Sequence, residues 1–182
     1  AAGRPDFHPR LQLVSFLQIQ RAIDDGGLDA VISFREAASM RISAVYEELA
    51  KVPLVCICHS EHPLAQRCSV TMDELKNERL VLFTPSRTSP VVADVQSGLM
   101  GGRAPSEFYF CDSGEAVVAL VCSGFGISVI PDLALPGGHP VAKVHIDDAA
   151  PLSFGIYHKP AQENKLLQTF IKTLKESFSL DA

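Results

Sequence analysis

The sequence predicts an α/β fold built from two lobes. Short apolar segments typical of buried strands alternate with helix-like segments along most of the 182 residues. Such alternation is typical of parallel sheets covered by helices. Turn-forming residues interrupt it twice, at 53–60 and at 147–151, so we expect the chain to cross between the lobes at these two places. The composition, 47% hydrophobic and 20% charged, is that of an ordinary globular domain.

The first lobe begins with a predicted strand–helix–strand unit, which should be parallel and right-handed. Gly26 and Gly27 follow its helix and are expected to end it. Near the C-terminus, apolar residues at helical spacing from Leu166 to Phe178 predict a final amphipathic helix. The expected elements of this part are a strand at 11–16, a helix at 18–25, and strands at 28–33, 45–49, 54–58 and 152–157.

The second lobe shows clear local signals for helix ends. Thr71 and Glu74 form a capping box pattern, and Pro90 stands at the first position of a helix that Gly101 and Gly102 end. In the segment 119–131, Gly124 is expected to end a helix in the left-handed conformation, Gly126 to permit a close backbone approach, and Pro131 to close a buried strand. The remaining elements are strands at 80–83, 107–111, 127–130 and 141–146, a polar loop at 84–89, and a helix capped by Asp112 and Glu115.

Charge and cysteine content narrow the possible functions. A net charge of −5, with no cluster of Lys and Arg, argues against nonspecific binding of phosphate backbones. No apolar run reaches 18 residues and no secretory signal opens the sequence, so we expect neither a membrane span nor export. Five cysteines without a disulfide pattern indicate free thiols in a reducing cytoplasm. Cys56, Cys58, His59 and His62 offer metal-ligand chemistry, but a strand with buried cysteines is the favoured interpretation, so no metal or cofactor is expected.

Three segments, in this order and at this spacing, resemble the effector-binding domain of LysR-type transcriptional regulators: Asp25–Ile32, Glu61–Ala65 and Ala119–Pro131. The resemblance covers roughly residues 7 to 178. It implies two Rossmann-like lobes with a hinge and an interlobe cleft, as in type-2 periplasmic binding proteins. The first lobe would comprise residues 1–58 and 149–182, and the second residues 59–148. It also implies that the opening strand and helix of the first lobe, and the winged helix-turn-helix, lie outside this sequence.

The loop 84–89 is the strongest candidate for ligand binding. It carries Arg87 and four hydroxyls, directly before a helix N-terminus, where free N–H groups and the helix dipole favour an anion. The alternative is a solvated turn that only caps the helix. The resemblance favours binding, because the family places effector contacts in this loop. The candidate residues are Thr84, Ser86, Arg87, Thr88 and Ser89.

The resemblance also suggests ligand contacts elsewhere. Phe16 stands where the family often has a residue with a small hydroxyl. This departure favours a ligand with an aromatic or apolar part, and a core role for Phe16 is the alternative. Gln18 follows in the same segment and is a further candidate contact. Tyr46 stands where some relatives have a carboxylate-binding arginine, so a simple dicarboxylate is less favoured. Ser113 and Phe125 lie at strand ends of the second lobe and are candidates to reach the cleft, although packing also explains Phe125.

The sequence contains no nucleophile elbow, zinc-protease motif, Walker loop or dinucleotide fingerprint, so an enzyme is not expected. The resemblance implies the ligand-sensing domain of a cytoplasmic regulator that binds a small anionic or polar effector and reaches DNA only through its winged helix-turn-helix. A homodimer or homotetramer is expected, since the helix after Pro90 is more apolar than one buried face requires. A transporter solute-binding protein, or an enzyme of the prephenate dehydratase or hydroxymethylbilane synthase type, is the alternative.

Overall fold

The structure is a computed structural model that describes residues 8–14, 16–36, 44–134, 141–160 and 164–179. Its contacts divide the chain into two compact units. Unit 1 comprises Ala1–Lys51 and Ser153–Ala182, and unit 2 comprises Val52–Leu152. The lobe boundaries predicted from the sequence, at 58/59 and 148/149, lie a few residues inside unit 2, and they stay a prediction.

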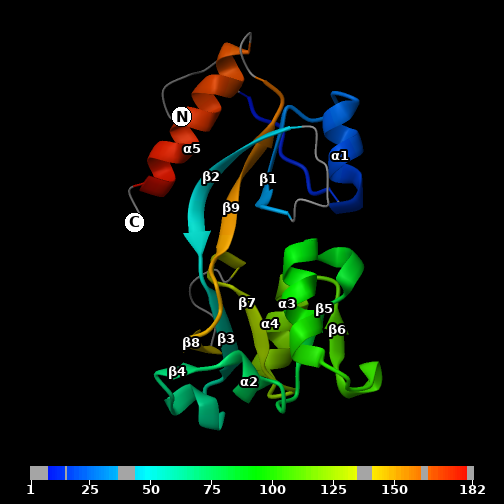
Figure 1. The fold of residues 1–182 in the computed structure, drawn as a ribbon, viewed down its shortest axis with the longest axis vertical. Coiled ribbons are helices and arrows are strands. Elements are labelled where there is room, and N and C mark those ends of the chain that lie inside the picture. The colour runs from blue at the N-terminus through cyan, green and yellow to red at the C-terminus, as the bar shows by residue number, and fades with distance from the viewer. Residues whose placement is uncertain (1–7, 15, 37–43, 135–140, 161–163, 180–182) are drawn as a thin grey trace. The chain divides into compact units, whose positions relative to one another are not determined.

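Unit 1 is a three-stranded sheet with a helix on each face (Figure 1). Its strands, in spatial order, are β1 (Ala30–Phe34), β9 (Leu152–His158) and β2 (Val45–Val52). β1 is antiparallel to β9, with Ala30 opposite His158 and Phe34 opposite Phe154. Successive residues of a strand point to opposite faces, so each face needs its own cover.

Two amphipathic helices supply that cover. From α1 (Phe16–Asp24), Ile19 and Ile23 pack with Val31 and Tyr157. From α5 (Lys165–Ser179), Leu167 and Ile171 pack with Ile156 on the other face. The stripe of apolar residues that predicted a helix near the C-terminus is therefore confirmed as the buried face of α5.

The predicted strand at 11–16 is wrong. Residues 11–14 belong to no strand, and α1 already begins at Phe16. Leu11 is 83% exposed and Leu13 is fully exposed, whereas Val14 packs against the core beneath α1. Alternating apolar residues form a strand only beside another strand that accepts their hydrogen bonds, and no strand of the described sheet pairs with this segment. The predicted parallel unit is thus not formed, and β1 pairs with the antiparallel β9 instead.

Unit 2 contains a mixed sheet in which the predicted strand–helix–strand pattern is confirmed. β5 and β6 are parallel and joined by α3. A bridge between Leu80 and Ile127 connects this pair to the larger sheet, whose order is β4-β8-β3-β7. The strands are β3 (Leu54–His59), β4 (Ser69–Val70), β5 (Val81–Phe83), β6 (Tyr109–Cys111), β7 (Ser128–Pro131) and β8 (Val141–Ile146). The helices are α2 (Met72–Leu75), α3 (Pro90–Met100) and α4 (Gly114–Cys122), with 3₁₀ turns at η1 (Pro63–Gln66), η2 (Pro85–Arg87), η3 (Pro105–Glu107) and η4 (Asp132–Ala134).

The core of unit 2 is built around β3. Every residue from Leu54 to Cys58 is buried, which shows that both faces of this strand are covered. On one face Val55 and Ile57 pack with Val117 and Val121 of α4. The uninterrupted apolar run that predicted a strand reflects this two-sided burial.

The two glycine predictions at the end of α4 are confirmed. Gly124 has φ 74°, in the region that favours glycine, and the helix ends there. At Gly126 a Cβ atom would collide with the carbonyl oxygen of Arg79 and lie 2.9 Å from its carbonyl carbon. Backbone atoms cannot move aside as a flexible side chain does, so this position requires glycine.

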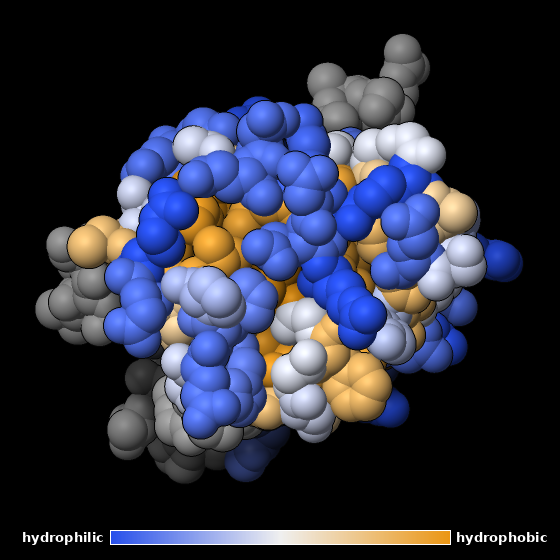
Figure 2. Space-filling model, turned by 90° about the horizontal axis from the view of Figure 1, so that it is seen from below, coloured by the Kyte–Doolittle hydropathy of each residue, from blue (hydrophilic) through white to orange (hydrophobic). Residues whose placement is uncertain are grey.

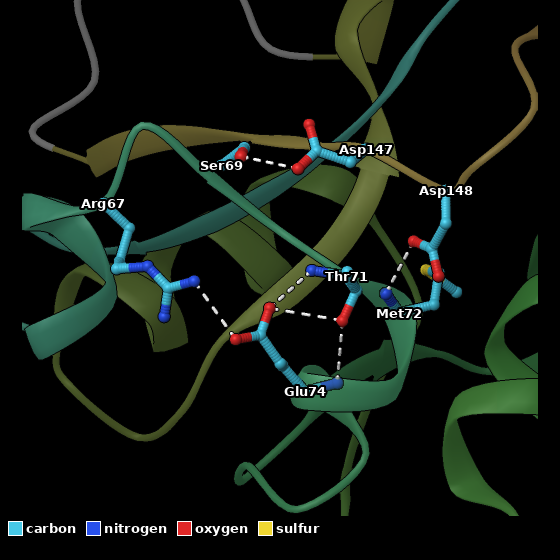
Figure 3. Close-up of polar contacts among 7 residues, drawn as sticks. All are labelled: Arg67, Ser69, Thr71, Met72, Glu74, Asp147 and Asp148. Atoms are coloured by element: carbon cyan, nitrogen blue, oxygen red, sulfur yellow. Dashed lines mark hydrogen bonds and ion pairs between the residues drawn. The ribbon is translucent and has the colours of Figure 1, made fainter.

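Of two helix caps predicted in unit 2, one is confirmed and the other is wrong. Thr71 and Glu74 form the predicted capping box, and Arg67 adds an ion pair to Glu74 (Figure 3). At α4 the prediction is wrong, because Ser113 is the N-cap and its hydroxyl accepts from Ala116 N–H at 3.3 Å. An N-cap side chain must stand just outside the first helical residue, which here is Gly114.

Aspartates at the end of β8 tie α2 to the sheet (Figure 3). Ser69 donates to Asp147 at 2.6 Å, and the backbone N–H of Met72 donates to Asp148 at 2.8 Å. From the end that carries β4 and α2 in Figure 1, Figure 2 shows hydrophobic residues in a hollow with a hydrophilic rim. Within the described residues, no helix is long and apolar enough to cross a membrane.

Candidate functional site

The parallel pairing of β5 and β6 brings two loops of unit 2 together. Phe83 lies opposite Cys111, the last residues of the two strands, so the segments that follow leave the sheet at the same edge. The N–H of Thr84 donates to the carbonyl of Cys111 at 2.8 Å and fixes this start of the loop. The carboxyl ends of parallel strands are where α/β proteins bind ligands. The loop 84–89 and the N-terminus of α4 therefore share one edge.

The loop holds its shape through its backbone and leaves its side chains available. Arg87 N–H donates to the Thr84 carbonyl at 2.8 Å, which closes the η2 turn. The side chains of Ser86 and Arg87 are exposed, and those of Thr84 and Thr88 are half-buried. Within the described part of the chain, no carboxylate forms an ion pair with Arg87. The guanidinium is thus available to an anion from outside the protein.

Ser89 is the N-cap of α3, but its hydroxyl does not cap the helix. Its backbone carbonyl accepts from Ala93 N–H at 2.9 Å, whereas its Oγ is buried and has no hydrogen-bond partner among the described residues. The first turn of α3 contains no acidic residue. Helix N-termini carry partial positive charge and unpaired N–H groups. The start of α3 therefore combines a shielded hydroxyl with a field that favours an acceptor or an anion.

The start of α4 differs, although it lies at the same edge. Ser113 uses its oxygen to cap the helix, and Glu115 already places a carboxylate in the first turn. The pKa of Glu115 lies below its ordinary value because its own backbone N–H, and then Ser113, hydrogen-bond its carboxylate. This carboxylate occupies the positive end of α4. Of the two helices, α3 is therefore the one that can receive an anion.

Phe125 lies away from this loop. Its ring packs edge-to-face on Tyr109, the first residue of β6, at 5.4 Å between centroids. The loop 84–89 follows the last residues of the strands, so Phe125 lies at the amino ends rather than the carboxyl ends. The sequence marks a strand end at this position without showing which edge of the sheet it joins. A ligand contact for Phe125 stays a prediction.

The candidates in unit 1 are only partly described. The side chain of Phe16 lies outside the described residues, and Gln18 is exposed on α1. The Tyr46 hydroxyl lies 2.9 Å from Ser153 Oγ, and Ser153 in turn donates to Glu48. Since the single Ser153 proton goes to Glu48, Tyr46 donates to Ser153 and keeps only lone pairs for another partner. Burial raises the pKa of Tyr46.

The ring of Tyr46 lies directly on β9. A Cβ at Gly155 would lie 2.7 Å from Cζ of this ring, so glycine is needed for the contact. The Tyr157 ring is tilted against it, with 4.7 Å between the ring centroids, and the Arg35 guanidinium lies 5.3 Å from the Tyr46 centroid. Arg35, Glu48 and Ser153 were not predicted as neighbours of Tyr46. The glycine inside a predicted strand was the one available signal, since such a glycine often marks a close approach.

The cysteine and histidine residues considered as metal ligands serve the core and its turns. Cys56 and Cys58 are fully buried, and burial raises the pKa of Cys56 to about 12. His59 Nδ1 accepts from Glu61 N–H, and His62 Nδ1 accepts from Leu64 N–H, both at 3.2 Å. Across the described ranges no three His, Cys, Asp or Glu side chains gather where a metal ion could bind. Thiols with raised pKa values are also poor nucleophiles.

Solved structures share this fold. They include the Corynebacterium glutamicum OxyR C206 mutant (TM-score 0.77, 18% identity, 96% of this chain and 56% of that chain) and the BenM effector-binding domain with its effector benzoate (TM-score 0.73, 19% identity, 92% and 77%). HinK, a LysR family transcriptional regulator from Pseudomonas aeruginosa, matches with a TM-score of 0.74 at 20% identity, over 93% and 60% of the two chains. These identities establish similarity of fold alone.

The sequence matches identify the family more specifically than these structural matches do. YnfL of Escherichia coli (strain K12), an uncharacterized HTH-type transcriptional regulator, is 26% identical over 129 residues. The match covers 70% of this chain but only 42% of YnfL. The model of the LysR substrate binding domain matches residues 1–179, which is nearly the whole sequence. The predicted two-lobed fold, like that of periplasmic binding proteins, is confirmed, and the transporter alternative is not favoured. The chain belongs to the LysR substrate-binding domain family, the effector-binding part of LysR-type transcriptional regulators.

Proposed function

We propose that this domain senses a small anionic or polar effector on behalf of a DNA-binding transcriptional regulator, and that the loop 84–89 with the start of α3 holds the effector's oxyanion. The observation that carries the proposal is Ser89, whose buried Oγ has no partner in the described residues and whose helix has no acid in its first turn. Arg87 supplies the matching charge from the exposed side of the loop.

The distribution of charge favours anion binding at one place and not over the whole surface. The chain as a whole carries a net charge of −5, which repels anions at long range. At the start of α3, an exposed guanidinium, the helix dipole and several hydroxyls converge within six residues. Hydrogen bonds to charged groups contribute about 1.5–3 kcal/mol each, enough for a few such contacts to hold a small acid.

Aromatic carboxylates are the first ligands to test. The BenM domain was solved with benzoate, and an effector with an apolar ring would also suit Phe16, which we propose as a contact for that part of the ligand. Gln18, Tyr46 and Ser113 are proposed as further contacts. Since Tyr46 already donates to Ser153, it would accept from a ligand group.

A panel of aromatic carboxylates, with benzoate as the first member, should raise the Tm of the domain when a ligand binds, and calorimetry then gives the affinity. Ser89→Ala should weaken binding about twofold to tenfold, as expected for one hydrogen bond. Ser123→Ala is the control, because Ser123 Oγ donates to the Ala119 carbonyl at the C-terminal end of α4, in the same unit. Failure of every acid to bind, or equal effects of the two variants, would refute an oxyanion site at α3.

We further propose that the regulator acts as a homodimer or homotetramer in the cytoplasm and reaches DNA through a winged helix-turn-helix outside this sequence. Val91 and Val95 of α3 are only half-buried, and β6, which pairs only with β5 among the described strands, exposes Tyr109 and Phe110. These apolar side chains suit an interface between copies. Sedimentation of the full-length protein should give at least a dimer, and Tyr109→Asp should shift it toward the monomer; a monomer at high micromolar concentration would contradict this.

We propose no catalytic role for this domain. Arg87 is an exposed cation, and the Ser113 hydroxyl that hydrogen-bonds Glu115 serves as the N-cap of α4. A nucleophilic hydroxyl needs a base that readily takes its proton, and a carboxylate with a lowered pKa is a weak base. Turnover of a bound acid, measured by product analysis, would overturn this assignment.

A further inference from the structure

One face of α3 carries an unexpected residue. The buried residues of α3 are Val92, Gln96 and Leu99, and with the N-cap Ser89 they recur at intervals of three and four, which places them on a single stripe. Val92 and Leu99 are the kind of side chain such a stripe requires. Gln96 is not, yet it is only 3% exposed, the same as Val92.

The amide of Gln96 is an unpartnered donor. Its Nε2 is shielded from solvent and has no hydrogen-bond partner among the residues the structure describes. A buried donor without a partner destabilises the fold, and a methionine of similar shape would avoid this. A glutamine at this position is therefore better explained by a partner that the described residues do not supply.

The geometry of the helix relates Gln96 to the oxyanion site. Ser89 and Gln96 are seven residues apart, so about 10 Å of helix rise separates them on the same stripe. Long side chains of a helix lean toward its N-terminus, which directs the Gln96 amide toward Ser89. Ser89 Oγ and Gln96 Nε2, both buried and without a partner among the described residues, thus lie along one face, and both can donate a hydrogen bond.

We propose that Gln96 is a specificity-determining residue of the effector site, and that its amide N–H donates to a second, uncharged acceptor oxygen of the effector. The effector class is then a small acid with a hydroxyl or carbonyl oxygen several ångströms from its oxyanion. A second charge is disfavoured because Gln96 is neutral and no cation accompanies it on the α3 stripe. Both atoms are shielded, so the loop 84–89 must open for the effector to enter. The inference rests on the proposed function.

The test compares acids with and without the second oxygen. Benzoate is the acid without it, and 3-hydroxybenzoate, 4-hydroxybenzoate and 3-acetylbenzoate carry one at different places. By calorimetry, wild type should bind at least one of the latter about twofold to tenfold more tightly than benzoate. Gln96→Met should abolish that preference and leave benzoate binding unchanged. Gln96→Glu keeps the shape but replaces the donor with a carboxylate, so it should weaken binding of all four acids.

Ser128→Ala is the matched control. Ser128 is also a buried polar residue of unit 2 with an unpartnered Oγ in the described structure, but it lies opposite Ile57, on the face that packs against α4. It should not alter the preference. Without ligand, Gln96→Met should raise the Tm by roughly 2–4 °C, because a buried unsatisfied donor is removed.

The outcomes separate the two proposals. A wild type that binds benzoate without preferring any oxygen-bearing acid, or a Gln96→Met variant that keeps the preference, overturns the role of Gln96 and leaves the oxyanion site intact. A Tm that falls in Gln96→Met also overturns it, since the amide then has a structural partner. A wild type that binds none of the four acids overturns the proposed oxyanion site, and the Gln96 inference with it.

Discussion

Replacing Arg87 with alanine should weaken effector binding without unfolding the domain. The side chain is exposed and forms no ion pair within the described residues, and the η2 turn is closed by the backbone N–H of Arg87 and not by its guanidinium. Surface substitutions of this kind usually change the free energy of unfolding by less than about 0.5 kcal/mol. The loss in affinity can therefore be measured on a folded protein.

The expected loss follows from the one interaction removed. A hydrogen bond to a charged group contributes about 1.5–3 kcal/mol, and each 1.4 kcal/mol corresponds to a tenfold change in Kd, so the loss is about tenfold to a hundredfold. Solvent screening around the exposed guanidinium favours the lower end. The affinity of Arg87→Lys should lie between those of wild type and Arg87→Ala, since lysine keeps the charge but not the planar pair of donors.

Calorimetry with the aromatic acid that binds wild type most tightly is the assay, repeated at two ionic strengths. Arg67→Ala is the control, because it removes the same charge from the same unit at a side chain paired with Glu74 at 3.1 Å. Unchanged affinity in folded Arg87→Ala would show that this guanidinium does not contact the effector. An equal loss in Arg67→Ala would show the same, because the effect would then reflect net charge rather than a contact.

Two predictions concern stability. Gly126→Ala should lower the free energy of unfolding by about 3 kcal/mol or more, measured by urea denaturation, since its Cβ would meet the backbone of Arg79; a loss below 1 kcal/mol would show that this backbone yields. Glu47 accepts from Lys175 and then from His158, and these contacts hold its pKa below the ordinary value of 4.5. Because the pKa of Glu47 is lower in the folded state, its ionised form stabilises the protein above pH 4.5. This stabilisation is lost as the pH falls through the pKa of the folded state. Wild type should therefore exceed Glu47→Gln in Tm at pH 7, and the difference should vanish toward pH 3; a difference independent of pH would contradict the assignment.

Features that depend on neighbouring residues could be predicted from the sequence. The Thr71–Glu74 capping box, the glycine that ends α4 and the stripe of α5 all arise within a few turns of chain. Local sterics and helical periodicity decide such features, so a pattern is enough to predict them. The strand–helix–strand pattern of unit 2 followed for the same reason, as did the loop before Pro90.

Features that depend on distant partners could not be predicted from the sequence and became apparent in the folded structure. Residues 11–14 alternate like a strand but have no strand beside them, and Phe125 ends a helix–strand junction at the edge of the sheet away from the loop 84–89. Tyr46 meets Ser153 across 107 residues, and Gln96 is buried in the folded domain although its side chain is polar. Pairing and burial are properties of what faces a residue across the fold. A hydrogen-bonding group left without a partner becomes visible only when every neighbour is in place.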